Sequence, residues 1–243
     1  MRCSTLSVGV VAGLLAGAAN AHGHIEKVVA GGKEYTGGIP SQAPADAVGW
    51  AAENQDNGFV APDAFGQADI ICHKGAKPVK NAVAVAAGEV VTLKWNTWPE
   101  SHHGPVLDYL APVSGDFASV NKESLKWTKI AEKGLESGSN PGTWASDELI
   151  SNGNSWTFTV PKNLKAGNYV LRHEIIALHS AGQENGAQAY PQCINLKVTG
   201  SGSGALNGGA FTSFYTPEDP GILFNLYEAF TSYPIPGPDV EKV

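Results

Sequence analysis

The chain has 243 residues, of which 42% are hydrophobic and 16% are charged, and its formal net charge at pH 7 is −7. This acidic balance argues against nucleic acid or an anionic lipid surface as the partner, and it is compatible with a neutral polymer or a small molecule. The length is sufficient for an all-β domain that buries a substantial core.

The first 21 residues have the features of a secretory signal peptide. A short positive region is followed by an apolar run, residues 6–19, and then by the small-residue cleavage pattern Ala19-Asn20-Ala21. A cut after Ala18 also fits this pattern, but the chain turns polar directly after Ala21. The run is shorter than the roughly 20 residues that span a bilayer, and no later stretch is apolar enough. We therefore expect a secreted protein without a membrane segment, with His22 at its amino terminus.

Short runs of alternating apolar residues lie between the 29 glycines and 15 prolines of the chain. They predict β-strands, because side chains at every second position share one face of a strand. Strands are predicted at residues 88–95, 104–111, 155–160, 167–175 and 193–200. With almost no long helical periodicity beside them, these short strands predict a β-sandwich.

Two long segments rich in glycine and proline, residues 36–70 and 200–243, are predicted to be loops. Loops of this length in a compact domain are usually functional. The second segment is too short and too poor in cysteine to form a separate binding module, so we expect it to wrap the domain that precedes it. The sequence therefore predicts one domain over residues 22–243, without a separate carbohydrate-binding module.

Three cysteines are present, and Cys3 would leave with the signal peptide. Cys72 and Cys193 remain as a pair in an oxidising compartment, where a disulfide is expected. The signal peptide also contains one arginine and no acidic residue, so its removal changes the net charge from −7 to −8.

His22 acquires a second metal-binding nitrogen if it becomes the first residue. Its α-amino group, with a pKa of about 7.7–8.0, and its ring Nδ1 can chelate a single metal ion. One further histidine would complete three nitrogens in a plane, with tyrosine or water on the axis, and such tetragonal ligation favours Cu(II). The alternative is that a histidine merely follows the cleavage site.

Candidate partners for His22 lie in two segments, "WPESHHGPVLDYL" (98–110) and "LRHEIIALHSAGQENGAQAYPQC" (171–193). His102 and His103 are adjacent, so at most one of them should face a given site. Gln188 and Tyr190 are two residues apart and should share a strand face, and His179 precedes them in the same segment. Taken singly, each of these residues could equally be a surface histidine, a polar strand residue or a core aromatic.

The leader junction at His22, together with "SHHGPV", "LRHEIIALHSA" and "GAQAYPQCINLKVTG", resembles the fungal lytic polysaccharide monooxygenases. The most similar group is the cellulose-active auxiliary-activity family nine, formerly glycoside hydrolase family sixty-one. The resemblance extends from His22 to the "DPGILFNLYEAF" segment and the "IPGP" tail. It implies an immunoglobulin/fibronectin-III-like antiparallel β-sandwich whose long loops form a flat substrate face, with one mononuclear copper per chain.

Carried over residue by residue, the resemblance makes His22 and His102 the copper ligands and Tyr190 the axial ligand. His103 falls on the variable position of the family's H-x-G-P motif. His179 and Gln188 match the residues that position the oxygen species, and Tyr227 matches a tyrosine that stacks on sugar. The family's common disulfide matches Cys72–Cys193.

The sequence departs from many relatives at two places. "APVSGDF" contains Val113 and Phe117 where relatives have a second disulfide, and the early loop contains no tyrosine. Trp50, the aromatic residue of that loop, is expected in the core. His24 is expected to be a solvated histidine, and His173 a structural one.

The resemblance predicts a copper monooxygenase that hydroxylates C1 and/or C4 of glucose units in cellulose or a related β-1,4-glucan. It would use O2 or H2O2 and an external reductant such as ascorbate, phenols or a redox enzyme, and act as a monomer. A glycoside hydrolase is disfavoured, because hydrolysis needs two carboxylates flanking one bond and no motif centres on such a pair. The other alternative is a non-catalytic copper- or polysaccharide-binding protein on the same scaffold.

Overall fold

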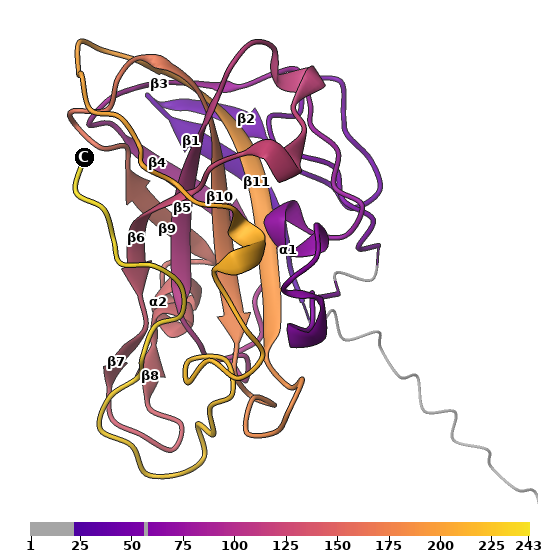
Figure 1. Cartoon of the computed structure of the whole chain (residues 1–243), viewed down its shortest axis with the longest axis vertical. Coiled ribbons are helices and arrows are strands. Elements are labelled where there is room, and N and C mark those ends of the chain that lie inside the picture. The colour runs from indigo at the N-terminus through magenta and orange to yellow at the C-terminus, as the bar shows by residue number, and fades with distance from the viewer. Residues whose placement is uncertain (1–21, 56–57) are drawn as a thin grey trace, which may run out of the picture.

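The computed structural model describes residues 22–55 and 58–243 of the chain (Figure 1). The predicted signal peptide, with Cys3, lies outside the described residues. Within the described part, two β-sheets share a buried apolar core that includes Val28, Leu93, Leu171 and Leu196. The predicted β-sandwich is therefore confirmed.

The first sheet has four strands within the described residues, in the order β2-β1-β4-β9. Their bounds are Lys33–Thr36, Ile25–Ala30, Val90–Trp95 and Ser155–Thr159. All three pairings are antiparallel. The predicted strands at 88–95 and 155–160 correspond to β4 and β9, whereas β1 and β2 were not predicted.

The second sheet has five strands in the part of the chain that the structure describes, in the order β3-β11-β10-β5-β6. Their bounds are Val83–Ala86, Gln188–Thr199, Gly167–Ala177, Val106–Val113 and Thr128–Lys133. β3 pairs parallel with β11, and the other pairs are antiparallel. The predicted antiparallel β-sandwich therefore has one parallel pairing at this edge, where β3 follows a long connection that returns it beside the last strand.

Part of the five-stranded sheet is buried on both faces. On β11, Ile194, Leu196 and Val198 face the other sheet, as their alternation predicts. Asn195 faces the opposite way and is also fully buried, because the early loop covers that face. Its side chain accepts a 2.7 Å hydrogen bond from Trp50 Nε1 and donates to the carbonyl of Val79 at 2.7 Å. Trp50 is 5% exposed, so its expected place in the core is confirmed.

Charged residues of β10 also lie under the loops. Arg172 and Glu174 are completely buried and form a bidentate ion pair, with hydrogen bonds of 2.8 and 2.5 Å. Arg172 donates further to the carbonyls of Ile70 and Ile71 on the segment that contains Cys72. The disulfide between Cys72 and Cys193 joins the same segment to β11. Its predicted pairing is confirmed.

The remaining elements are short. The helices are α1 (Asp69–Cys72) and α2 (Ala145–Ser151), and a small hairpin is formed by β7 (Leu135–Ser137) and β8 (Thr143–Trp144). Single 3-10 turns occur at Pro62–Ala64, Phe117–Ser119, Lys122–Ser124 and Phe211–Ser213. Helix α2 and the hairpin were not predicted. Over residues 22–55 and 58–243, no helix is long and apolar enough to cross a membrane.

The last forty or so residues pack along the sandwich as an extended segment (Figure 1). Near its end, the backbone nitrogen of Glu241 donates to the carbonyl of Lys129 at 2.9 Å, and Lys129 Nζ donates to the carbonyl of Pro236 at 2.8 Å. At the lower end of Figure 1, the same segment meets the β7–β8 hairpin and the loop between β10 and β11. There the carbonyl of Ala181 accepts from the backbone nitrogen of Phe224 at 2.8 Å.

Candidate metal centre

The residues that the sequence nominated as a metal site come from four parts of the fold. His22 directly precedes β1, and His102 lies in the loop between β4 and β5. His179 follows β10, and Gln188 and Tyr190 lie at the start of β11. Because β10 and β11 are antiparallel, with Ile175 opposite Tyr190, the end of one strand and the start of the other lie at the same edge of the sheet.

Three of these side chains converge around His22. Its ring centroid is 5.1 Å from that of His102 and 5.3 Å from that of Tyr190, and it is stacked on the tyrosine at an angle of 28°. The rings of His102 and His179 are 3.9 Å apart. The structure therefore brings together four aromatic side chains that are separated by up to 168 positions in the sequence.

His102 has the environment of a metal ligand, because one of its ring nitrogens has no hydrogen-bond partner among the described residues. It is buried, and its Nδ1 lies 3.1 Å from Ser101 Oγ. Its Nε2 is also buried and has no hydrogen-bond partner among the described residues. Burial lowers the pKa of His102 to about 3, and the neighbouring His179 and His22 add to the shift. The ring is therefore neutral at mild pH, as metal ligation requires.

A free amino terminus at His22 would give this group of residues a third nitrogen donor. In the described part of the chain, no three His, Cys, Asp or Glu side chains are grouped as a metal site. Two imidazoles alone would not suffice, but cleavage before His22 would add an α-amine on the same residue as one ring. The buried, unpaired Nε2 of His102 beside that ring fits a metal bound by two imidazoles and one amine. The residues present therefore fit copper.

Gln188 and Tyr190 share a face of β11, as predicted. The tyrosine hydroxyl donates a 2.7 Å hydrogen bond to Oε1 of Gln188. His179 lies against His102 on the other side, and its Nδ1 is buried without a hydrogen-bond partner within the described residues. Burial lowers the pKa of His179 too, and the neighbouring His22 and His103 add to this shift.

Two aromatic residues that were not predicted complete the surroundings. Phe59 lies 6.3 Å from the ring of His22 and 6.1 Å from that of Tyr190, and Trp98 packs edge-on against Tyr190 at 5.0 Å. Trp98 Nε1 also donates to the backbone carbonyl of His102 at 3.0 Å. Neither residue belongs to an alternating run, so only the short sequence distance between Trp98 and His102 could have signalled a link.

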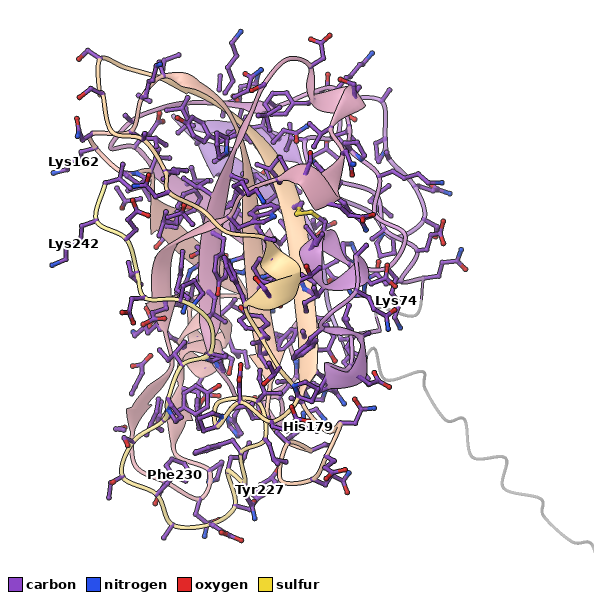
Figure 2. All side chains as sticks on the ribbon, in the orientation of Figure 1. Lys74, Lys162, His179, Tyr227, Phe230 and Lys242 are labelled. Carbon is purple, nitrogen blue, oxygen red and sulfur yellow. A yellow bond between two sulfur atoms is a disulfide. The ribbon has the colours of Figure 1, made fainter. Side chains whose placement is uncertain are left out.

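The predicted substrate contact, Tyr227, is 53% exposed on the C-terminal segment. Figure 2 shows it at the same end of the molecule as His179 and Phe230. Phe230 packs with Trp144 and Phe224, at ring distances of 6.1 and 5.0 Å, and these rings support the segment from below. Tyr227 is therefore presented to solvent on a supported loop at the end of the sandwich that carries the histidines.

Among the other histidines, the expectation for His173 is met, whereas His24, expected to be solvated, is half-buried. His173 is fully buried, with Nδ1 bonded to Asp108 at 2.7 Å and Nε2 accepting from Trp95 Nε1 at 3.2 Å. It is a structural residue, as predicted. His24 is half-buried, and its backbone nitrogen donates to Asn96 at 2.8 Å. His103 faces away from His102 and bonds Asp147 at 2.8 Å, which confirms that only one of the adjacent pair faces the site.

Comparison with known proteins decides the family. The sequence pattern of Auxiliary Activity family 9 (formerly GH61) matches residues 22–233. The chain belongs to Auxiliary Activity family 9. Among its curated relatives, "AA9 family lytic polysaccharide monooxygenase F" of Malbranchea cinnamomea is 61% identical over 226 residues, which cover 93% of each chain. "AA9 family lytic polysaccharide monooxygenase E" of Aspergillus tamarii is 52% identical, covering 94% of this chain and 95% of the relative.

Solved structures agree with this membership of Auxiliary Activity family 9. The "Extended catalytic domain of H. jecorina LPMO9A a.k.a EG4" superimposes with a TM-score of 0.86 at 50% identity, and 90% of each chain is covered. A "Cellulose-active Polysaccharide Monooxygenase from M. thermophila" gives a TM-score of 0.79 at 32% identity, covering 91% of this chain and 99% of the other. The protein is therefore a lytic polysaccharide monooxygenase, an enzyme that cleaves polysaccharide chains oxidatively.

Proposed function

We propose that this monooxygenase uses one copper per chain to cleave cellulose or a related β-1,4-glucan. The α-amine and ring of His22 and the Nε2 of His102 would bind the metal, and Tyr190 would be a further ligand. The observation that carries the proposal is the buried, unpaired Nε2 of His102 beside the ring of His22. A buried polar atom normally has a partner, and a metal ion supplies one here.

When bound, copper would supply the one-electron chemistry that activates O2 or H2O2. The net change is insertion of one oxygen atom into a C–H bond at C1 or C4 of a glucose unit. With H2O2, the second oxygen leaves as water. With O2, an external donor such as ascorbate, a phenol or a redox enzyme must provide two electrons, and two protons are taken up with them. The hydroxylated carbon then expels the glycosidic oxygen, and the chain breaks.

The chain's own residues orient this chemistry. The Tyr190 hydroxyl donates to Oε1 of Gln188, so Nε2 of the same amide is the group that can donate to another molecule. The ring of His179 provides a second hydrogen-bonding group against His102. These two residues flank the proposed ligands and would hydrogen-bond to the oxidant, because preorganised polar groups need no rearrangement during the reaction. Tyr227 would stack on a sugar ring through its exposed face.

Processing completes the proposed site. Removal of residues 1–21 in a secretory pathway would release the α-amine of His22 into the metal site, in an extracellular protein that acts as a monomer. Residues 22–243 would then form one catalytic domain. The proposed partners are the glucan surface, the oxidant and the reductant, with neither nucleic acid nor membrane among them.

The test is incubation of the copper-loaded secreted protein with amorphous cellulose, with and without ascorbate, read by mass spectrometry. We expect aldonic acids from C1 oxidation, 4-keto sugars from C4 oxidation, or both, in the presence of ascorbate. EDTA should abolish these products and excess copper should restore them. Unmodified oligosaccharides alone, formed equally in the presence of EDTA, would overturn the proposal in favour of hydrolysis. Copper-dependent production of H2O2 without oxidised sugars would instead indicate a non-catalytic binding role.

A further inference from the structure

Helix α2 holds the loop that presents His102. Ser146 bonds Gly104 twice, since its Oγ accepts from the glycine nitrogen at 3.0 Å and its own nitrogen donates to the glycine carbonyl at 3.2 Å. One residue further along the helix, Asp147 uses both carboxylate oxygens. Oδ1 bonds Nδ1 of His103 at 2.8 Å, and Oδ2 accepts from the backbone nitrogen of Trp144 at 2.8 Å. The loop and the start of the helix are thereby joined through one carboxylate.

The bond between His103 and Asp147 is directional and partly shielded. A carboxylate can only accept, so Nδ1 of His103 must carry the proton, and the ring has one orientation relative to the helix. The two side chains are 20% and 24% exposed. By contrast, Lys133 of β6 and Glu148 of α2, which form an ion pair, are 42% and 37% exposed. The His103–Asp147 bond is therefore better shielded from solvent than this ion pair.

Backbone contacts fix the path of this loop. The carbonyl of His102 accepts from Trp98 Nε1 at 3.0 Å, and the carbonyl of His103 accepts from the nitrogen of Leu178 at 2.9 Å. A Cβ at Gly104 would lie 1.8 Å from the carbonyl oxygen of Ile176, so the loop already touches β10 as closely as the backbone allows. These contacts hold the backbone of the loop, and the bond between His103 and Asp147 adds a side-chain link from the same loop to α2.

The bond from His103 bears on His102, because the two residues are consecutive and their rings leave the chain in different directions. The ring of His102 contacts His22 and His179, whereas that of His103 contacts Asp147. Anchoring the second ring therefore sets the direction in which the first one points. We propose that His103 and Asp147 are positioning residues, which hold Nε2 of His102 at the angle required by the metal. The inference depends on the copper site of the proposed function.

The test measures Cu(II) affinity by isothermal titration and the electron paramagnetic resonance spectrum of the bound copper, in secreted protein with a free His22 amine. His103→Phe keeps a planar ring but cannot donate a hydrogen bond. It should weaken copper binding by about tenfold, which is the lower end of the usual effect of residues that orient ligands. The hyperfine coupling of the bound copper should also change. His103→Asn can still donate to Asp147 and should recover most of the affinity and the parent spectrum. Asp147→Ala should match His103→Phe, and the double variant should be no weaker than either.

Glu148→Gln is the matched control, because it breaks a side-chain link on the same helix without touching the loop. It should lower the unfolding temperature of the copper-free protein about as much as His103→Phe does, while copper affinity and spectrum stay unchanged. Affinity within twofold of the parent in both His103→Phe and Asp147→Ala would overturn the inference. So would a His103→Asn variant as weak as His103→Phe. Weak copper binding by the parent protein would overturn the proposed function. Tight binding by the parent and equally tight binding by the variants would overturn only the inference about His103 and Asp147.

Discussion

The hydroxyl of Tyr190 donates a 2.7 Å hydrogen bond to Oε1 of Gln188, two residues earlier on the same face of β11. A hydroxyl can reach this amide only because side chains at every second position of a strand lie side by side. The bond ties the proposed axial ligand to a group proposed to orient the oxidant. The two residues should therefore behave as one unit.

Tyr190→Phe tests this unit, because it keeps the packing against His22 and Trp98 and removes only the hydroxyl. We expect the rate of oxidised-product formation to fall by at least about tenfold, as for other groups that orient metal ligands, since Gln188 loses the partner that sets its amide. Gln188→Ala should cause a fall of similar size, and the double variant should be no slower than the slower single one. Initial rates by mass spectrometry decide this, and multiplicative losses would show that the two residues act independently.

His22 should be indispensable while His24, two residues on, should not. His22→Ala removes an imidazole, and one extra residue before His22 removes the free amine, so each change should abolish both tight copper binding and oxidised products. His24→Ala is the matched control and should retain both, because His24 does not supply a proposed ligand. Copper titration and product analysis on the same samples provide the measurement. Full activity in the extended protein would contradict ligation by the amino terminus.

Tyr227→Ala should weaken adsorption to cellulose. The exposed ring would lose a stacking contact with sugar, and by analogy with other aromatic contacts this amounts to about 1 kcal/mol, or roughly fivefold in the dissociation constant. Val90→Ala removes a side chain of similar exposure, 50% against 53%, from β4. Binding isotherms on microcrystalline cellulose should separate the two variants, with copper affinity unchanged in both. Equal adsorption would show that Tyr227 does not contact the substrate.

Glu174→Leu should be among the most destabilising single changes in the molecule. It leaves the fully buried guanidinium of Arg172 without its carboxylate and removes the acceptor of a 2.8 Å hydrogen bond from Tyr215. Breaking such a pair usually costs about 3–5 kcal/mol. Replacing both charges, with Arg172→Met added, should recover part of this loss.

The exposed pair of Lys27 and Glu34, at 46% and 48% exposure, is the control. Glu34→Gln should change the free energy of unfolding far less than Glu174→Leu does, because exposed pairs are screened by solvent. Urea denaturation of the four proteins compares these values directly. A loss in Glu174→Leu no larger than that in Glu34→Gln would mean that Arg172 finds another partner or water.

The parts of the fold that were predicted are those in which burial on one face leaves an alternating pattern. In β4 and β9, the apolar residues point into the core and the residues between them face outward. Elements without this pattern were missed. β1 begins directly after the cleavage site, and β6 has no regular alternation. Helix α2 is only seven residues long, too short to show a helical period.

The residues around the candidate site also fall into two groups, those identified from the sequence and those identified only in the structure. Resemblance to relatives nominated His22, His102, His179, Gln188 and Tyr190, because their motifs can be read along the chain. Phe59, Trp98 and Asp147 carry no such motif. Asp147 is 44 positions from His103, and their 2.8 Å bond exists only because α2 packs against the loop before β5. A contact of that kind depends on the path of the chain between the two residues, which local sequence does not encode.

By itself, the sequence determined the β-sandwich, the disulfide of Cys72 and Cys193, and the family to which the chain belongs, since each depends on local patterns or on motifs shared with relatives. Only the tertiary structure decided that β3 pairs parallel with β11, that Arg172 and Glu174 are buried under the loops, and that His103 is bonded to α2. It also left Nε2 of His102 buried beside the ring of His22, without a hydrogen-bond partner among the residues that the structure describes. Burial and hydrogen bonding are properties of the assembled chain, because they depend on what distant segments place around each atom.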